Sequence, residues 1–213
     1  MLDINFAQVF IAFLVLVFSL TVHESAHAWV ADRLGDPTGR RLGRVSLNPA
    51  VHVDPVGTLL FPLVAMLTRL PIIGWARPVP LDPRNLRRGR RDVLLVAGAG
   101  PLSNLALAVL SAWALKLVAL GPESVGQIGV AAPLARAASR ALEINLLLAI
   151  FNMIPVPPLD GSSVLAGLLP ESAAAGFDRL RPYGFLVLYA LMLSGAVWYL
   201  VGPPFVWMLS WLL

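Results

Sequence analysis

The chain has 213 residues, of which 58% are hydrophobic and only 13% are charged, and its mean hydropathy is +0.78. A soluble domain carries about twice that charged share and could not bury so much apolar surface, so we expect a protein that crosses a membrane several times. No cysteine is present, which excludes disulfides, thiolate metal sites and iron–sulfur clusters. The formal charge of +4 comes from arginines between apolar runs, which favours charged loops beside a membrane over a nucleic-acid-binding surface.

Three apolar stretches predict a core of three membrane-spanning helices. They cover about residues 6–31, 93–120 and 142–158. The first is long enough to cross a bilayer with tilt, because about 26 residues at ~1.5 Å each span roughly 39 Å. The third must lose its helical form near its end, since Pro155, Pro157 and Pro158 cannot continue a helix. Residues 121–137, between the second and third spans, are expected to form a short loop.

The C-terminal quarter of the chain predicts further membrane-spanning structure. Residues 183–213 form a last apolar region, which we expect to break at Gly202-Pro203-Pro204. The sequence therefore predicts an all-α polytopic membrane protein with its core at residues 1–165. The remainder, residues 166–213, is expected to contain a cytoplasmic loop and one or more spans.

Two arginine-rich loops set the expected orientation. Residues 33–44 hold four arginines and residues 77–91 hold six, so both loops are expected on the cytoplasmic side, with the N-terminus outside and the loop after Asp160 inside. The apolar stretch between them, residues 56–74, must then enter and leave on the same side. It is short, contains two prolines and places Arg69 where a full span would hardly tolerate a charge. We expect a re-entrant hairpin buried in protein, and a full span is the alternative.

The motif His-Glu-x-x-His lies inside the first predicted span, at His23, Glu24 and His27. Residues four apart share a helix face, so both imidazoles can bind one zinc ion. Glu24 lies beside them, placed to take a proton from a zinc-activated water. The alternative is a polar patch packed against a neighbouring helix, but ionisable groups at membrane depth are costly and usually functional.

A catalytic zinc site usually has three protein ligands and one open position, so a third ligand is expected from another segment. Asp160 is the main candidate because it follows the prolines that unwind the third span, and broken backbone at this depth is tolerated where it lines a cavity. The alternative is that Asp160 lies in an ordinary turn at the end of a helix and binds no metal. His52 and Asp54 compete for the same ligand position, although we expect them to fix the entry to the re-entrant hairpin.

Two asparagines at membrane depth are candidate substrate-binding residues. Asn104 follows Gly98 and Gly100 in the second span, and Asn152 lies where the third span begins to unwind. Each amide could hold a substrate carbonyl or stabilise an oxyanion, or it could bridge two helices, which the glycines would allow to approach closely. Residues 74–81 alternate weakly and are expected to form a small strand-like segment whose edge pairs with an extended peptide. An ordered loop at the membrane interface is the alternative.

Together these motifs resemble the site-2 protease family of intramembrane zinc metalloproteases. The matching pieces, in order through about residues 6–165, are His23-Glu24-x-x-His27, Gly100-x-x-x-Asn104 and Asn152-x-x-Pro-x-Pro-x-x-Asp160-Gly161. The resemblance implies that His23, His27 and Asp160 bind zinc and that Glu24 is the general base. It implies further that Asn104 and Asn152 hold the substrate peptide. The chain resembles a compact member, because residues 121–137 are too few for the PDZ domain of several relatives and no nucleotide-sensing domain follows the last span.

The expected function is that of a zinc endopeptidase which cleaves transmembrane segments of membrane-anchored substrates in a prokaryotic cell membrane. Its expected partners are a transmembrane protein or peptide substrate and the lipid bilayer, with no nucleic acid, and the oligomeric state stays open. One alternative is a membrane metal-ion transporter, although such proteins usually show internal repeats and none is visible here. The other is a non-catalytic membrane protein braced by zinc, which a closed site with four protein ligands would indicate.

Overall fold

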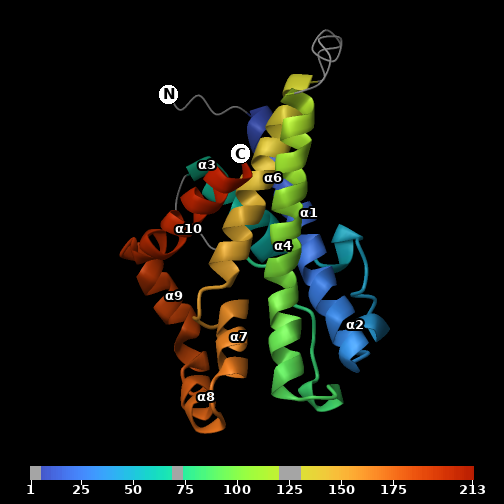
Figure 1. Cartoon of the computed structure of the whole chain (residues 1–213), viewed down its shortest axis with the longest axis vertical. Helices are drawn as coiled ribbons and strands as arrows, with labels where there is room; N and C mark the ends of the chain where they lie inside the picture. The colour runs from blue at the N-terminus through green and yellow to red at the C-terminus, as the bar shows by residue number, and fades with distance from the viewer. Residues whose placement is uncertain (1–5, 69–73, 120–130) are drawn as a thin grey trace.

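The structure is a computed structural model that describes residues 6–68, 74–119 and 131–213, and every regular element in these ranges is helical (Figure 1). The α-helices are α1 (Phe6–Leu34), α2 (Thr38–Arg41), α3 (Phe61–Thr68), α4 (Arg90–Ala119), α6 (Ala131–Asn152), α7 (Asp160–Leu168), α8 (Glu171–Asp178), α9 (Gly184–Leu193) and α10 (Ala196–Leu212). Short helical turns lie at Pro49–Val51, Pro55–Leu60, Pro83–Asn85 and Arg181–Tyr183. The prediction of an all-α fold is confirmed for these residues.

Two of the described helices, α1 and α4, are long and apolar enough to cross a membrane. The C-terminal helices add a third crossing if the two arms that meet at a 75° bend after Leu193 count as one broken span. The apolar side chains of Phe10, Leu14 and Phe18 form an exposed stripe on α1, since residues four apart share a helix face. Such a stripe is typical of a helix that contacts lipid.

The third predicted span differs from the observed helix at both ends. α6 begins at Ala131, so the prediction of a loop is wrong for residues 131–137, and the rest of that loop lies outside the described residues. The N-terminal and middle parts of α6 carry Arg136, Arg140 and Glu143, with Arg140 paired to Glu143 at 2.7 Å. Because these charged residues interrupt the apolar pattern, the sequence did not predict this part of the helix. α6 ends at Asn152, before the prolines, as their chemistry requires.

The C-terminal break falls at Gly195 and not at Gly202-Pro203-Pro204. Gly195 has φ +74°, a left-handed conformation that ends α9 and that glycine adopts without a steric penalty. α10 then continues through Pro203 and Pro204. Helices inside membranes tolerate such prolines because neighbouring groups satisfy the freed carbonyls.

The segment predicted as a re-entrant hairpin has two arms that contact each other. The Trp75 N–H donates to the Gly57 carbonyl at 3.0 Å, and the Thr58 hydroxyl donates to the Trp75 carbonyl at 2.8 Å. A side chain at Gly57 would collide with the Trp75 ring, so the close approach requires glycine. Residues 69–73, between the two arms in the sequence, lie outside the described residues, and the re-entrant path of this segment stays a prediction.

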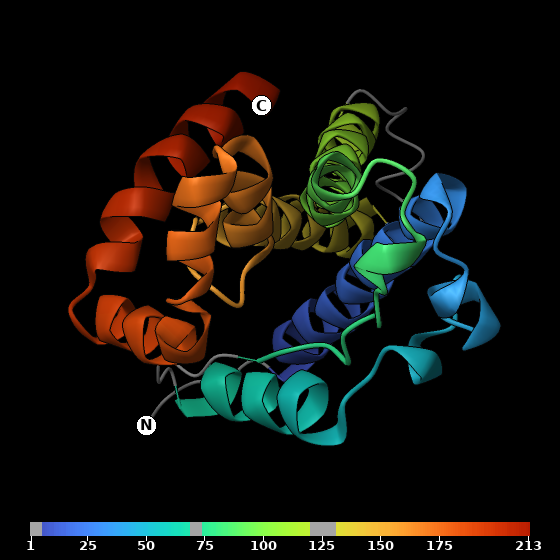
Figure 2. The same ribbon diagram turned by 90° about the horizontal axis from the view of Figure 1, so that it is seen from below.

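The predicted strand at residues 74–81 is absent, because this segment has no regular secondary structure. Pro78 and Pro80 have no N–H to donate to a ladder. Its neighbour in the other arm, Pro55–Leu60, is helical and so presents no strand edge. The segment instead runs as an irregular chain between α3 and α1 (Figure 2).

The two arginine-rich loops lie at the same end of the helix bundle, the lower end in Figure 1, as the charge pattern predicts. The Arg87 N–H donates to the Leu34 carbonyl at 3.3 Å. The buried Asp36 carboxylate accepts from the Asp82 N–H at 2.8 Å and from the Asn85 amide at 3.0 Å. Burial alone would raise the pKa of Asp36, but the hydrogen bonds from Thr38, Asn85 and Asp82 outweigh burial and lower this pKa.

Candidate active site

The His-Glu-x-x-His motif and Asp160 meet at one point. His23 and His27 lie one turn apart on α1, and their Nε2 atoms are 3.0 Å apart. Asp160, the first residue of α7, places its Oδ2 3.1 Å from the His23 Nε2 and 3.3 Å from the His27 Nε2. Among the described residues, these three side chains form the group that could hold a metal ion.

The spacing and chemistry of the three donor atoms fit zinc. In a tetrahedral zinc site, Zn–N and Zn–O bonds of about 2.0–2.2 Å place the ligand atoms roughly 3.3 Å apart. The observed separations are close to this distance. The Asp160 Oδ2 is buried and accepts no hydrogen bond. Two imidazole lone pairs and a carboxylate oxygen therefore face one another, an arrangement that a cation between them would stabilise.

The opposite nitrogen of each imidazole is held by a hydrogen-bond acceptor. The His27 Nδ1 lies 2.7 Å from the Val96 carbonyl on α4, and the His23 Nδ1 lies 2.6 Å from the Asn104 side-chain oxygen. Acceptors at these positions require the proton on Nδ1, which leaves Nε2 unprotonated and able to bind a metal. The carbonyl of Val96 could not have been identified from the sequence, because any residue type supplies the same group.

Gly100 forms the surface of α4 against which the two imidazoles pack. A Cβ at this position would collide with the His27 Nε2 and with ring atoms of His23. The expectation that glycines allow close approach therefore holds at Gly100 but not at Gly98, where a Cβ would have nothing within 4 Å. Gly161 has a similar packing role inside α7, since a Cβ there would collide with the Met153 backbone.

Glu24 lies beside the metal-binding group and faces a cavity of about 860 Å³. Its Oε2 accepts a hydrogen bond from the Val79 N–H at 3.2 Å. The cavity is bounded by α1, α4, the end of α6, the start of α7, α9 and the segment at residues 74–81. Its lining is mostly apolar, including Phe151, Phe185 and Leu188. The site therefore opens into a space that suits an apolar chain.

The two candidate substrate-binding asparagines occupy different positions. Asn152 lines the cavity, and its amide nitrogen donates to the Leu148 carbonyl of its own helix at 3.0 Å. Asn104 is fully buried and is bonded to His23 and Asn145. The position of Asn104 favours a role in holding His23 over contact with a substrate. Asn145 was not recognised from the sequence, although a buried amide within an apolar run was a signal for it.

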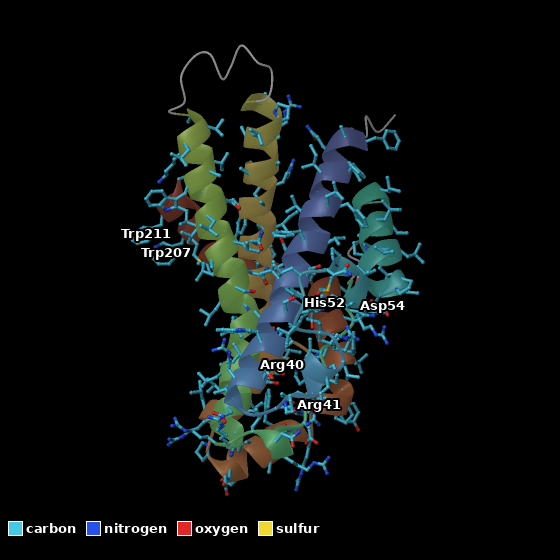
Figure 3. All side chains as sticks on the ribbon, turned by 90° about the vertical axis from the view of Figure 1, so that its right-hand side faces the viewer. Arg40, Arg41, His52, Asp54, Trp207 and Trp211 are labelled. Carbon is cyan, nitrogen blue, oxygen red and sulfur yellow. The ribbon has the colours of Figure 1, made fainter. Side chains whose placement is uncertain are left out.

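His52 and Asp54 lie outside the metal-binding group, with His52 beside α1 and Asp54 at the start of the helical arm of the hairpin (Figure 3). The His52 Nε2 is 2.8 Å from the Ser46 carbonyl and 3.2 Å from the Ser25 hydroxyl. The Asp54 side chain accepts from the Val56 and Gly57 N–H groups and caps the turn at Pro55–Leu60. Both residues thus fix the start of the hairpin.

Comparisons with known proteins identify relatives of the chain. YwhC of Bacillus subtilis, named as a candidate zinc metalloprotease, is 39% identical over 189 residues, which cover 88% of this chain and 82% of YwhC. Rip2 of Mycobacterium tuberculosis, named likewise, is 32% identical over 83% of this chain and 64% of Rip2. Rip2 of Mycolicibacterium smegmatis is 28% identical over 85% of this chain and 66% of that protein. No protein-family model and no solved structure matches the chain. The identity to YwhC, which extends over most of both chains, confirms the resemblance found in the motifs: the chain belongs to the site-2 protease family of zinc metalloproteases.

Proposed function

We propose that the chain is an intramembrane zinc endopeptidase that cleaves transmembrane segments of membrane-anchored proteins. The observation that carries this proposal is the convergence of His23, His27 and Asp160, with Glu24 beside them, on the wall of an apolar cavity. The ligand group contains three protein side chains among the described residues, whereas a bracing zinc site usually has four. The arrangement therefore favours catalysis over the zinc-braced alternative.

The depth of the site supports cleavage within the bilayer. His23 precedes Arg33, in the last turn of α1, by ten residues, or roughly 15 Å at helical rise. The exposed apolar stripe at Phe10, Leu14 and Phe18 extends from the other side of the site. Arg40 and Arg41 lie further toward the arginine-rich end than His52 (Figure 3). We place that end in the cytoplasm of a prokaryotic cell and the N-terminus outside, by the positive-inside rule.

Peptide hydrolysis at this site requires an electrophile and a base. A bound zinc ion supplies Lewis acidity, which polarises a peptide carbonyl and acidifies water. Glu24 takes a proton from the attacking water and passes it to the leaving amine. The Val79 N–H, 3.2 Å from the Glu24 Oε2, orients the carboxylate toward the cavity segment. This contact joins the base to the wall on which we place the substrate.

The segment at residues 74–81 is suited to hold an extended substrate. The backbone N–H groups of Trp75, Arg77 and Val79 donate to the Gly57 carbonyl, the His52 carbonyl and the Glu24 carboxylate, respectively. Ala76 and Pro78 are both cavity residues, and in this proposal their carbonyls accept N–H groups of an unwound substrate. Such bonds offset part of the cost of unwinding its helix.

Co-expression with single-span substrates tests the proposal. Candidate membrane proteins with one transmembrane segment are expressed with the wild type or with Glu24→Gln. We expect zinc-dependent cleavage products with the wild type and none with Glu24→Gln, because glutamine cannot accept the proton. The two purified proteins should contain equal amounts of zinc. Cleavage by Glu24→Gln would overturn the assignment of the base. Products cut only outside the transmembrane segment would overturn the intramembrane site.

A further inference from the structure

A chain of buried amides connects the metal-binding group to α6. The His23 Nδ1 lies 2.6 Å from the Asn104 Oδ1, and the Asn104 Nδ2 donates to the Asn145 Oδ1 at 2.9 Å. The Asn145 Nδ2 then donates to the Ala141 carbonyl at 2.8 Å. We propose that Asn145 is a positioning residue, which orients the Asn104 amide so that His23 presents an unprotonated Nε2 to the metal. This inference rests on the metal site of the proposed function.

The direction of the chain follows from its last acceptor. The Ala141 backbone carbonyl can only accept a hydrogen bond, so the Asn145 amide turns its nitrogen toward it and its oxygen toward Asn104. That oxygen in turn requires the nitrogen of Asn104, whose own oxygen then faces His23. The only proton that can lie between the Asn104 oxygen and the imidazole is the one on Nδ1. A backbone carbonyl three links away thus sets the tautomer of a metal ligand.

Without Asn145, the Asn104 amide has little to hold its orientation. The remaining acceptor near its Nδ2 is the Ser19 carbonyl at 3.4 Å, which is long for a hydrogen bond. A reversed amide would present N–H groups to the His23 Nδ1 and favour the tautomer with its proton on Nε2. That nitrogen could not bind zinc, because its lone pair would carry the proton. Asn104 and Asn145 are 0% and 2% exposed, so solvent cannot replace the missing partner.

His27 provides an internal comparison. Its Nδ1 faces the Val96 backbone carbonyl at 2.7 Å. A backbone carbonyl cannot reverse, so the tautomer of His27 needs no further support. Loss of Asn145 should therefore change His23 and leave His27 as it is, which a general loss of packing would not do.

The test measures zinc affinity by competition with a chelator, and histidine tautomers by ¹⁵N NMR of the metal-free protein. We expect Asn145→Leu to lower zinc affinity at least tenfold and to give His23 a mixture of tautomers while His27 keeps its proton on Nδ1. Asn145→Asp keeps an acceptor toward Asn104 and should stay within about threefold of the wild type. These ranges follow the 10- to 100-fold effects of residues that orient metal ligands.

A second background distinguishes loss of the Asn104 orientation from a general loss of packing in Asn145→Leu. Asn104→Asp has two acceptor oxygens and cannot reverse, so adding Asn145→Leu to it should cause no further loss of zinc affinity. Wild-type affinity and an unchanged His23 tautomer in Asn145→Leu would overturn the proposal, as would equal losses in the leucine and aspartate variants. If the wild type binds no zinc, the proposed function fails, but the histidine tautomers of the metal-free protein still test the hydrogen-bond chain from Ala141 to His23.

Discussion

The two walls of the cavity are built in different ways. The metal-binding wall consists of side chains on α1 and α7, which are supported by groups of α4 and α6. A second wall, residues 74–81, has no regular structure and is held by contacts from Thr58, Arg44 and Glu24. Catalysis by a bound metal requires ligands that are fixed to within a fraction of an ångström. An irregular segment, in contrast, opens at a lower free-energy cost than packed helices. Substitutions of the metal ligands and their supporting groups should therefore weaken or remove metal binding, and those in the second wall should impair substrate use with the metal retained.

The largest effect is expected for Asp160→Ala. Loss of one of three ligands should lower zinc affinity by more than about 100-fold and abolish cleavage. Metal analysis of the purified protein checks this outcome, with Asp178→Ala as a control because Asp178 pairs with Arg181 at the surface. A stoichiometric zinc content in Asp160→Ala would show that the third ligand is another group.

Gly100→Ala should weaken zinc binding without removing any ligand. The new methyl group would occupy space taken by the His23 and His27 rings, and we expect zinc affinity to fall about 10- to 100-fold. Gly98→Ala is the matched control, since its methyl group meets nothing within 4 Å. Chelator competition measures both variants, and equal affinities in the two would contradict the packing of the imidazoles on α4.

Arg44→Ala should impair cleavage without affecting zinc binding, because, of the two walls, Arg44 contacts only the second. The buried Arg44 guanidinium donates to the Val51 carbonyl and lies 3.4 Å from the Arg77 carbonyl, so it joins the loop before the hairpin to the cavity segment. Loss of these bonds leaves carbonyls without a donor, at about 1–3 kcal/mol each. We expect cleavage to fall about tenfold with zinc content unchanged. The exposed Arg41→Ala is the control, and loss of zinc in Arg44→Ala would show that the walls are not independent.

The smallest effect is expected for Asp36→Asn, which belongs to neither wall, although its carboxylate accepts from the Asp82 N–H just beyond the cavity segment. Because the folded protein has a lowered pKa at Asp36, this carboxylate stabilises the fold at pH values above its unfolded pKa, near 3.8. The contribution is lost as the pH falls through the lower folded value. Asp36→Asn should thus unfold more easily by about 1–2 kcal/mol at pH 7, and the difference should shrink below pH 4. Denaturation at both pH values measures it, and a constant difference would contradict the role of the charge.

The sequence predicted the fold and the site best where long apolar runs contain residues with distinctive chemistry. The first two spans were predicted because uncharged runs of this length have few other uses, and the proline run placed the unwinding before Asp160. The start of α6 was missed because Arg136, Arg140 and Glu143 interrupt its apolar pattern. Gly195 was missed as the break because two prolines nearby were a stronger signal. The roles of Gly100 and Asn145 depend on which helices pack together, which one sequence does not specify.

The composition of the cavity also determines what would block it. A metal-binding group on the wall of a mostly apolar cavity selects an inhibitor with one metal-binding head group on an extended, uncharged body. A charged body would lose hydration without gaining a comparable partner in the mostly apolar lining. A hydroxamate on a short apolar peptide has this design, and it would bind in the orientation that a scissile bond adopts.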